Sequence, residues 1–299
     1  MTLCITPGDP SGVGPEVVAK ALAERGADGV EVLGDARCAD WLEREGVDVA
    51  LWVPPGDEPP EVAAVREAVA RCLDGRARGL VTGPIHKGRL ARRGFAHPGH
   101  TDFLGELCGV ERPVMAFVGG RVRVALVTVH LPLRRVADAL TTEAVVHTVR
   151  TAHHALVTQL GLEAPRLLVC GLNPHAGDDG LLGHEDRDVV APAVALARAE
   201  GLDAVGPMSA EAAFRAAVAG RGDMVVACYH DQGLAPLKAL EALSGSGAVN
   251  WTLGLPIVRT SVDHGTADDI AGKGIADHRS MLAALHLADE LTRRARASS

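Results

Sequence analysis

Short apolar runs alternate with longer amphipathic stretches along most of the chain. The apolar runs have the length and residue types of buried strands, and the amphipathic stretches have the spacing of helices with one buried face. The predicted strands lie at residues 3–6, 30–34, 47–53, 79–87 (running into a loop), 113–119, 122–129, 166–170, 203–207, 224–228 and 257–261. The predicted helices are residues 16–25, 36–45, 60–73, 142–160, 183–200, 209–219 and 277–297, with another beginning at Asp102. This alternation predicts an α/β fold with βαβ units and a mostly parallel sheet.

Two local signals refine this pattern. Gly119 and Gly120 separate two apolar runs, which predicts a hairpin. Thr101 precedes the helix predicted to begin at Asp102, so its side chain is expected to cap that helix. His100 would then lie beside a helix N-terminus, a favourable place for a phosphate or carboxylate group.

Composition excludes several classes of protein. The net charge of −8 and the lack of a long basic run argue against nucleic-acid binding, as does an aromatic content of only 3%. No apolar stretch reaches the length of a membrane span, and no signal peptide is visible, so we expect a cytoplasmic protein. The six cysteines are far apart and form no C-x-x-C pair, which is typical of free, buried thiols.

Three histidines each follow the end of an apolar run: His130, His175 and His230. Parallel strands of one sheet would bring these turns to the same edge. Three neutral imidazoles suit Zn²⁺, Co²⁺ or Ni²⁺ and leave a position open for substrate. The alternative is that each histidine is a separate, hydrogen-bonded loop residue, and the sequence pattern alone leaves both open.

A second set of side chains suits an anionic ligand. Arg259 lies within a strand-like run, where an arginine needs a carboxylate or phosphate partner. Lys238 lies about two helical turns after Asp231 and can share its face. Singly, either cation could form a structural ion pair. Together with His100 and Thr101 they indicate a small phosphorylated or carboxylated substrate.

Two glycine-rich segments complete the picture. The first strand ends in PGDPSGVGPE, which is either a structural turn or an anion site at a helix start. The second segment, DHGTADDIAGKG, contains too much glycine to pack a core. Such a loop usually lets its backbone approach a ligand closely.

These motifs resemble those of the 4-hydroxythreonine-4-phosphate dehydrogenase family of pyridoxal phosphate biosynthesis. The resemblance spans nearly the full chain and is carried by ITPGDPSGVGPE, VTGPIHKG, GHTDFL, VHLPL, CGLNPHAGDDG, YHDQGL and VNWTLGLPIVRTSVDHGTA. It implies an isocitrate/isopropylmalate dehydrogenase-like fold of two α/β/α domains, with the active site in the cleft between them. Residues 1–102 with 255–299 would form the domain carrying the cofactor loop. Residues 103–254 would carry the metal ligands and a dimer interface.

The resemblance also implies an activity. Members of the family oxidise the 3-hydroxyl of 4-phosphooxy-L-threonine with NAD(P)⁺, and loss of CO₂ then gives 3-amino-2-oxopropyl phosphate. A divalent metal (zinc, cobalt or magnesium) would be held by His130, His175 and His230. The family forms homodimers in which both subunits contribute to each substrate site. The substrate contacts implied by motif are His100, Thr101, Lys238, Asn250 and Arg259.

A wider resemblance assigns the cofactor loop: GDPSGVGPE and HGTADDIAGKGIAD are similar to the opening and the NAD loop of isopropylmalate and isocitrate dehydrogenases. The residues expected to contact the adenosine half of the cofactor are Gly265, Thr266, Ala267 and Asp269. An acidic residue there favours NAD over NADP, because it repels a 2′-phosphate and accepts a hydrogen bond from a 2′-hydroxyl. Asp231 and Lys238 are both candidates for the general base.

Three other functions compete with this one. A related dehydrogenase could act on D-threonate or D-erythronate 4-phosphate, since its motifs would overlap heavily. A metal-dependent hydrolase would also use three histidines and an open site, but it has no use for the DHGTADDIAGKG loop. A non-catalytic phosphometabolite-binding module could use Lys238 and Arg259, but it would not need the histidines.

Overall fold

The computed structural model describes residues 1–97, 99–245 and 247–297, and the chain divides into two compact units. Unit 1 comprises Met1–Pro113 and Val249–Arg296, whereas unit 2 is formed mainly by Val114–Ala248. The division expected from the sequence differs in that it gave residues 103–113 and 249–254 to the second domain. The structure places β10 (Val249–Leu253) in unit 1 because it pairs antiparallel with β11 (Arg259–Val262).

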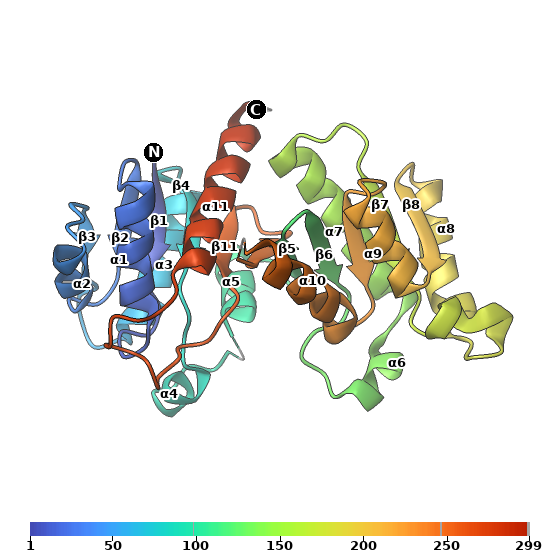
Figure 1. The fold of residues 1–299 in the computed structure, drawn as a ribbon, viewed down its shortest axis with the longest axis horizontal. Helices are drawn as coiled ribbons and strands as arrows, with labels where there is room; N and C mark the ends of the chain where they lie inside the picture. The colour runs from blue at the N-terminus through green and yellow to red at the C-terminus, as the bar shows by residue number, and fades with distance from the viewer. Residues whose placement is uncertain (98, 246, 298–299) are drawn as a thin grey trace. The chain divides into compact units, whose positions relative to one another are not determined.

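Unit 1 is built on a mostly parallel sheet with the strand order β3-β2-β1-β4-β11-β10 (Figure 1). Its remaining strands are β1 (Thr2–Thr6), β2 (Val30–Leu33), β3 (Leu51–Trp52) and β4 (Ala77–Thr82). β11 runs parallel to β4, with Thr260 opposite Val81, and only β10 is antiparallel within this set. Strands from both ends of the sequence therefore lie side by side in the sheet.

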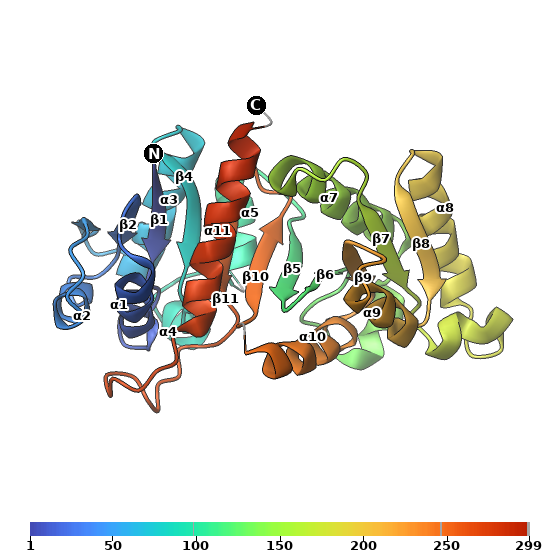
Figure 2. The same cartoon turned by 45° about the horizontal axis from the view of Figure 1, so that its top comes forward.

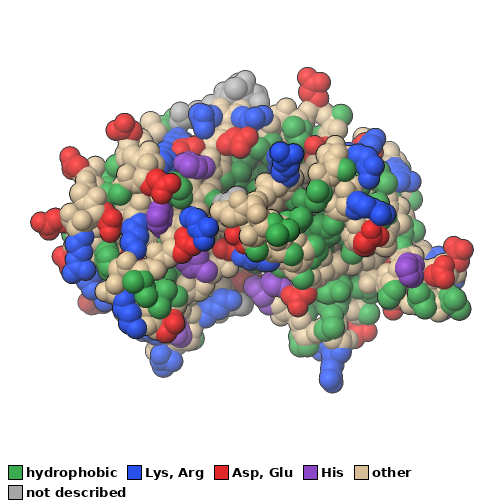
Figure 3. Space-filling model, viewed as in Figure 1, with side chains coloured by type: hydrophobic (Ala, Val, Ile, Leu, Met, Phe, Trp, Pro, Cys, Tyr) green, Lys and Arg blue, Asp and Glu red, His purple; other side chains and the backbone are tan. Residues whose placement is uncertain are grey.

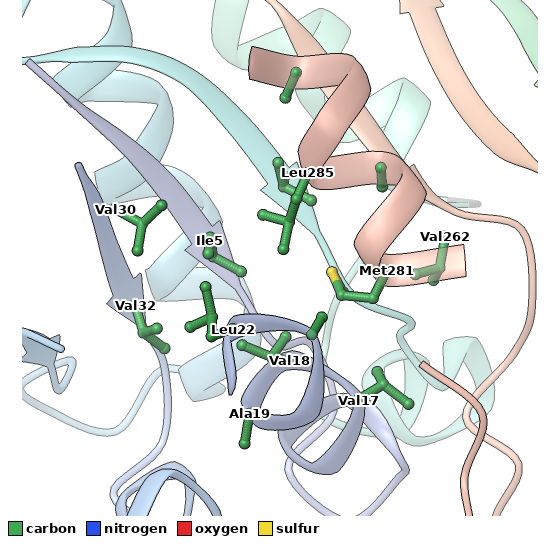
Figure 4. Close-up of a cluster of buried hydrophobic side chains, with 14 of the residues drawn as sticks. Ile5, Val17, Val18, Ala19, Leu22, Val30, Val32, Val262, Met281 and Leu285 are labelled. Atoms are coloured by element: carbon green, nitrogen blue, oxygen red, sulfur yellow. The ribbon is translucent and has the colours of Figure 1, made fainter. Parts of the chain in front are cut away.

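Helices cover both faces of the unit 1 sheet. They are α1 (Gly14–Arg25), α2 (Cys38–Arg44), α3 (Pro60–Leu73), α4 (Lys87–Arg92), α5 (His100–Cys108) and α11 (Arg279–Ala297). On one face, Leu22 of α1 and Leu285 of α11 pack with Ile5 of β1 in a buried apolar cluster (Figure 4). On the other face, Val65 of α3 and Leu104 of α5 belong to a second cluster.

Unit 2 has the strand order β5-β6-β9-β7-β8. Its strands are β5 (Val114–Gly119), β6 (Val122–Leu126), β7 (Arg166–Cys170), β8 (Asp203–Met208) and β9 (Met224–Ala227). β5 and β6 form the predicted antiparallel hairpin, whereas β6, β9, β7 and β8 run parallel. The carboxyl ends of these four parallel strands therefore lie at one edge of the sheet.

Four helices of unit 2 pack on this sheet (Figure 2): α7 (Thr142–Leu160), α8 (Ala191–Ala199), α9 (Ala210–Val218) and α10 (His230–Ser244). The short α6 (Val136–Ala139) contacts the helical turn Leu133–Arg135, and further short helical turns lie at Pro174–Gly180 and Asp186–Val190. Phe214 of α9 and Leu237 of α10 bury against Leu126, Leu168 and Val225 of the strands. α7 packs against β5, β6 and β9.

The α/β fold with a mostly parallel sheet is confirmed, but some boundaries were wrong. Thr101 does not cap a helix, because α5 begins at His100, two residues before the predicted start at Asp102, and Gly99 occupies the N-cap without a side-chain hydrogen bond. The strand expected at residues 47–53 pairs only over Leu51–Trp52 at the sheet edge. The helix expected at 183–200 becomes regular only from Ala191.

The surface agrees with the composition. On the face shown in Figure 3, Lys and Arg side chains are interspersed with Asp and Glu side chains over both units. Within the described ranges, no helix combines the length and the apolar character needed to cross a membrane.

Candidate active site

The three histidines follow three neighbouring strands of unit 2. His130 comes after β6, His230 after β9 and His175 after β7. β9 pairs in parallel with β6 on one side and with β7 on the other. The three turns therefore leave the same edge of the sheet, as carboxyl ends of parallel strands do.

His130 and His230 form a close pair. Their ring centroids are 5.8 Å apart, and the ring planes are tilted by 40°. His230 Nδ1 lies 2.7 Å from Asp231 Oδ1, so the carboxylate can hold the ring in one tautomer with Nε2 as the acceptor nitrogen. An imidazole oriented by a carboxylate is a common arrangement around bound zinc.

His175 lies in a turn with unusual backbone geometry. His175, Ala176, Asp178 and Asp179 all have positive φ values, between 43° and 54°. Residues in this left-handed region are energetically costly and concentrate at functional sites. Asp186, which is only 1% exposed, holds the turn by accepting hydrogen bonds from the backbone of Leu172 and Asn173 and from the Asn173 side chain.

The described residues of one chain do not by themselves complete a metal centre. No group of three His, Cys, Asp or Glu side chains within residues 1–97, 99–245 and 247–297 is placed to hold an ion. The neighbours His130 and His230 supply two imidazoles, whereas His175 stands in its own turn. Imidazole nitrogens are donors that suit a borderline-soft cation such as Zn²⁺.

Polar side chains fix the strand ends beneath the histidine pair. The side chain of Gln232 accepts from Cys228 N at 2.7 Å and donates to Gly171 O at 2.7 Å, so it joins β9 to β7. Thr128 Oγ1 donates to Cys228 O at 2.8 Å, which joins β6 to β9. Burial raises the pKa of the Cys170 thiol to about 12, so this cysteine is a neutral packing residue. The six cysteines are all free, as the sequence predicted.

Helix α10 carries three of the expected site residues. It begins at His230, so Asp231 lies in its first turn, and Lys238 follows on the same helix. The rise of about 1.5 Å per residue separates the backbones of His230 and Lys238 by about 12 Å. Burial lowers the pKa of Lys238, although Glu241 acts in the opposite direction. A lysine with a lowered pKa is better suited to accept a proton near neutral pH.

In unit 1, Arg259 is a buried cation with no carboxylate partner among the described residues. It is 3% exposed, and its guanidinium donates to neutral oxygens: Thr82 Oγ1 at 2.6 Å, Thr252 Oγ1 at 2.8 Å and Asn250 Oδ1 at 3.2 Å. Its Nε is buried without a hydrogen-bond partner. Burial lowers the pKa of Arg259 to about 9. A buried guanidinium of this kind favours an anionic ligand nearby.

His100 lies in the electric field of this arginine. Burial, with Arg259 and Lys87 nearby, lowers the pKa of His100 to about 3. His100 is the first residue of α5, and Thr101 follows in the same turn. The first turn of a helix also presents free backbone N–H groups, which favour a negative charge. Both expected residues are therefore in a positive environment of unit 1.

The segment between β11 and α11, residues 263–278 (here called the β11–α11 loop), contains the expected cofactor residues. Gly265 is exposed, and a Cβ placed on it would meet no atom within 4 Å. Ala267 has a positive φ of 44°. Thr266 is buried against the first turn of the chain, whereas Asp269 is exposed. Asp269 forms no side-chain hydrogen bond or ion pair with any part of the chain that the structure describes.

The sequence motifs do not identify several residues that hold these sites in place. Asp186 and Gln232 fix the histidine turns, and Thr82 and Thr252 hold Arg259. Asp186 could have been noticed as a carboxylate at a predicted helix start. The two threonines carry no sequence signal, because they meet Arg259 only when the strands pair.

The fold and these sites first define a class. The crystal structure of isocitrate dehydrogenase from Methylococcus capsulatus aligns with 100% of this chain and 88% of its own, with a TM-score of 0.53 and 15% identity. At this identity the likeness shows the fold alone, which is that of the isocitrate dehydrogenase class. The expected fold relationship is thereby confirmed.

Sequence comparison is more specific. The family model described as pyridoxal phosphate biosynthetic protein PdxA matches residues 59–288, which is more than half of the chain. The chain belongs to the PdxA family. The 4-hydroxythreonine-4-phosphate dehydrogenase of Geobacter metallireducens is 44% identical over 97% of this chain and 95% of its own length. The same enzyme of Methylorubrum populi is 43% identical over 98% and 95%.

Solved structures agree with this assignment. The crystal structure of 4-hydroxythreonine-4-phosphate dehydrogenase from Klebsiella pneumoniae covers 97% of this chain and 99% of its own, with a TM-score of 0.87 and 34% identity. The family inferred from the motifs is confirmed, as is the expectation of an oxidoreductase of the dehydrogenase type.

Proposed function

We propose that this protein oxidises 4-phosphooxy-L-threonine at the 3-hydroxyl with NAD(P)⁺, and that the product loses CO₂ to give 3-amino-2-oxopropyl phosphate. The names of the relatives supply the substrate. The structural observation that carries the proposal is the His130–His230 pair at the carboxyl edge of the unit 2 sheet. A hydroxy-acid dehydrogenase needs an electrophile at such a place, next to the hydroxyl that loses its proton.

We assign His130, His175 and His230 as ligands of a divalent ion. Bound there, the ion would supply a Lewis acid for the substrate hydroxyl and for the carbonyl oxygen that replaces it. Nitrogen ligands favour zinc or cobalt over magnesium, which prefers oxygen. Asp231 holds His230 through Nδ1, and Asp186 holds the backbone of the His175 turn. These contacts orient the ligands before any ion binds.

The site is proposed to be completed in a homodimer. Two of the three imidazoles are neighbours within one chain, and no set of three converges among its described residues. A symmetric dimer would let the His175 turn of a second copy serve the His130–His230 pair. In a two-fold assembly the same contact occurs twice, which gives two equivalent sites.

The substrate carries a carboxylate and a phosphate, and the chain offers cations for both. Arg259 is buried without a carboxylate partner, and Asn250 lies against its guanidinium. His100 and Thr101 present the first turn of α5. Lys238 adds a further cation on α10. We propose these five residues as the substrate contacts, and the cation-rich surroundings of His100 support an anionic ligand.

Lys238 is the better of the two candidates for the general base. Its pKa is lowered by burial, so Nζ can be neutral in a larger fraction of molecules and accept the proton of the 3-hydroxyl. Asp231 already accepts a hydrogen bond from His230. When bound, NAD(P)⁺ would supply the hydride acceptor for C3, and the bond to the carboxylate would then break to release CO₂. Lys238 can return its proton to the enolate that remains.

The cofactor is assigned to the β11–α11 loop, with Gly265, Thr266, Ala267 and Asp269 near its adenosine half. Asp269 is exposed and uncommitted, which supports a contact with the ribose and a preference for NAD. Thr266 is buried, so its contribution would come from its backbone.

A substrate screen with NAD⁺ tests the proposal. 4-Phosphooxy-L-threonine should give NADH and CO₂ in equal amounts, whereas D-threonate and D-erythronate 4-phosphate should react more slowly by kcat/KM. Faster turnover of either sugar acid would assign the protein to that related activity. Phosphate or ester hydrolysis without any NADH would indicate a metal-dependent hydrolase. Binding of the phosphorylated acid without any reaction would favour a non-catalytic module.

A further inference from the structure

The β11–α11 loop is attached to the first turn of the chain by buried carboxylates. Figures 1 and 2 show the loop passing beside α4 and the start of α1, and the backbone of Val13 donates to Thr266 O at 3.0 Å. Gly12 fits closely under Thr266, because a Cβ added at Gly12 would lie 2.8 Å from the threonine Cβ. The loop is therefore packed on the GDPSGVGPE turn, far away in the sequence.

The first attachment runs through Arg89 of α4. Its Nε donates to Asp9 Oδ2 at 2.7 Å, and its two terminal nitrogens donate to Asp268 at 2.6 and 3.0 Å. Asp9 is 3% exposed and also accepts from Ser11 N at 2.9 Å. One guanidinium thus joins a buried carboxylate of the turn to a carboxylate of the loop. The paired, bidentate geometry is the strong form of such a contact.

The second attachment runs through Glu16 of α1. This carboxylate is 1% exposed and accepts from Ala276 N at 2.7 Å and Gly274 N at 3.2 Å. Lys20 Nζ donates to Glu16 at 2.8 Å and to the carbonyl oxygens of the same two loop residues at 2.9 and 3.1 Å. The glutamate–lysine pair therefore binds both polar groups of this backbone segment.

These two attachments lie on either side of residues 269–273. They also leave two neighbouring aspartates, Asp268 and Asp269, in different environments. Asp268 is committed to Arg89, and hydrogen bonds from Arg89 and Thr266 hold the pKa of its carboxyl below its usual range. Asp269 is exposed and makes no side-chain hydrogen bond within the described parts of the chain. A loop rich in glycine would otherwise lose much conformational entropy on binding a ligand.

We propose that Arg89 is a positioning residue for the cofactor: it bridges Asp9 and Asp268 and so holds the β11–α11 loop in its binding conformation before the dinucleotide arrives. This inference rests on the proposed function for its cofactor, but the bridge itself is independent of that function. Arg89 does not contact the reacting atoms. By fixing the loop beforehand, Arg89 reduces the conformational entropy that the loop loses when the cofactor binds.

The test uses three variants of the full chain. Arg89→Met removes the bridge from one side, and Asp268→Asn removes it from the other. Arg92→Met is the matched control, since Arg92 is exposed on the same short helix. Hydrogen exchange of the cofactor-free protein reports the order of residues 264–276, and steady-state kinetics report KM and kcat for NAD⁺.

In both bridge variants we expect faster exchange of the loop amides and a KM for NAD⁺ raised by about three- to tenfold, the effect of losing one ordinary hydrogen bond. kcat should stay within about twofold, since the bridge serves binding rather than chemistry. The double variant should resemble Arg89→Met, because that single variant has already lost the contact with Asp268. Arg92→Met should match the wild type.

Unchanged exchange in Arg89→Met would overturn the bridge. Faster exchange with an unchanged KM would overturn its role toward the cofactor. If the wild-type protein binds no dinucleotide at all, the proposed function is wrong in its cofactor, and hydrogen exchange still decides whether Arg89 holds the loop.

Discussion

The imidazole rings of His130 and His230 lie 5.8 Å apart on turns that follow neighbouring strands, β6 and β9. Adjacent strands are spaced by about 4.8 Å, so the sheet itself sets the separation of the two turns. Gln232 and Thr128 tie these strand ends to each other and to β7. The sheet therefore sets the spacing of this pair, and the proposed third metal ligand is His175.

Replacing His175 by asparagine tests that third ligand. Asparagine tolerates the positive φ of 54° at this position, so the fold should be retained. We expect loss of bound metal by elemental analysis and a fall in kcat/KM of more than about a hundredfold, since groups that only orient ligands already contribute about 10- to 100-fold. His154→Asn, on an exposed position of α7, is the control. Full metal content in the His175 variant would remove this residue from the site.

Mixing two inactive variants tests the shared site. His175→Asn and His230→Ala subunits, once exchanged, should form heterodimers with one intact site of the two. Random mixing would then restore about a quarter of wild-type activity. His130→Ala mixed with His230→Ala should restore none, because both residues belong to the same pair. No recovery in the first mixture, with exchange confirmed by mass spectrometry, would place all three ligands on one chain.

Asp269→Ala should change the choice of cofactor. Without this carboxylate, kcat/KM with NAD⁺ should fall and discrimination against NADP⁺ should relax by about tenfold, the effect of one lost hydrogen bond to a charged group. Asp268→Asn should instead weaken both cofactors equally, since Asp268 is bound to Arg89. Equal NAD⁺ to NADP⁺ ratios in the Asp269 variant and the wild type would show that Asp269 does not read the ribose.

His100 should make stability depend on pH. Its folded pKa of about 3 lies below the usual value of 6.5, so below pH 6.5 the unfolded chain binds a proton that the folded chain does not. The contribution of neutral His100 to the free energy of unfolding is therefore fully present above pH 6.5 and is lost as the pH falls toward 3. Because His100 is partly exposed, we expect a loss of about 1 kcal/mol between pH 7 and pH 5, below the limit of about 1.4 kcal/mol per pH unit.

Urea unfolding of wild type and His100→Asn at both pH values measures this contribution, because the other histidines cancel in the difference. The variant should lose less stability than the wild type on acidification. Parallel pH profiles for the two proteins would show that His100 keeps an ordinary pKa.

Elements with a regular pattern of apolar residues could be predicted from the sequence. Helices α3 (Pro60–Leu73) and α7 (Thr142–Leu160) have the predicted bounds, because their apolar spacing and their ends are local signals. Ser209, the first residue of the predicted helix 209–219, caps α9 by accepting a hydrogen bond from Ala212 N. The position of the three histidines after apolar runs was also visible, because the carboxyl ends of parallel strands share an edge.

Contacts between distant segments could not be predicted in the same way. Arg89 meets partners 80 and 179 residues away, so no spacing along the chain points to it. The left-handed turn at His175 follows from its attachment to Asp186, while the sequence showed only a polar loop after a proline. The Thr101 cap failed because Gly99 adopts an extended conformation that lets α5 begin at His100.

Unit 1 is built from two segments that are far apart in the sequence, and this affects how the chain folds while the ribosome makes it. Thr82 at the end of β4 and Arg259 of β11 are hydrogen-bonded partners separated by 177 residues. At about 5–20 residues per second, a ribosome needs roughly 10 to 35 s to make that intervening chain. Throughout this interval β4 can pair with β1 on one side but lacks β11 on the other, whereas most of unit 2 is continuous and can fold as it emerges. Until β11 is made, the nascent first half of unit 1 therefore presents an unpaired edge of β4, the kind of edge through which nascent chains aggregate.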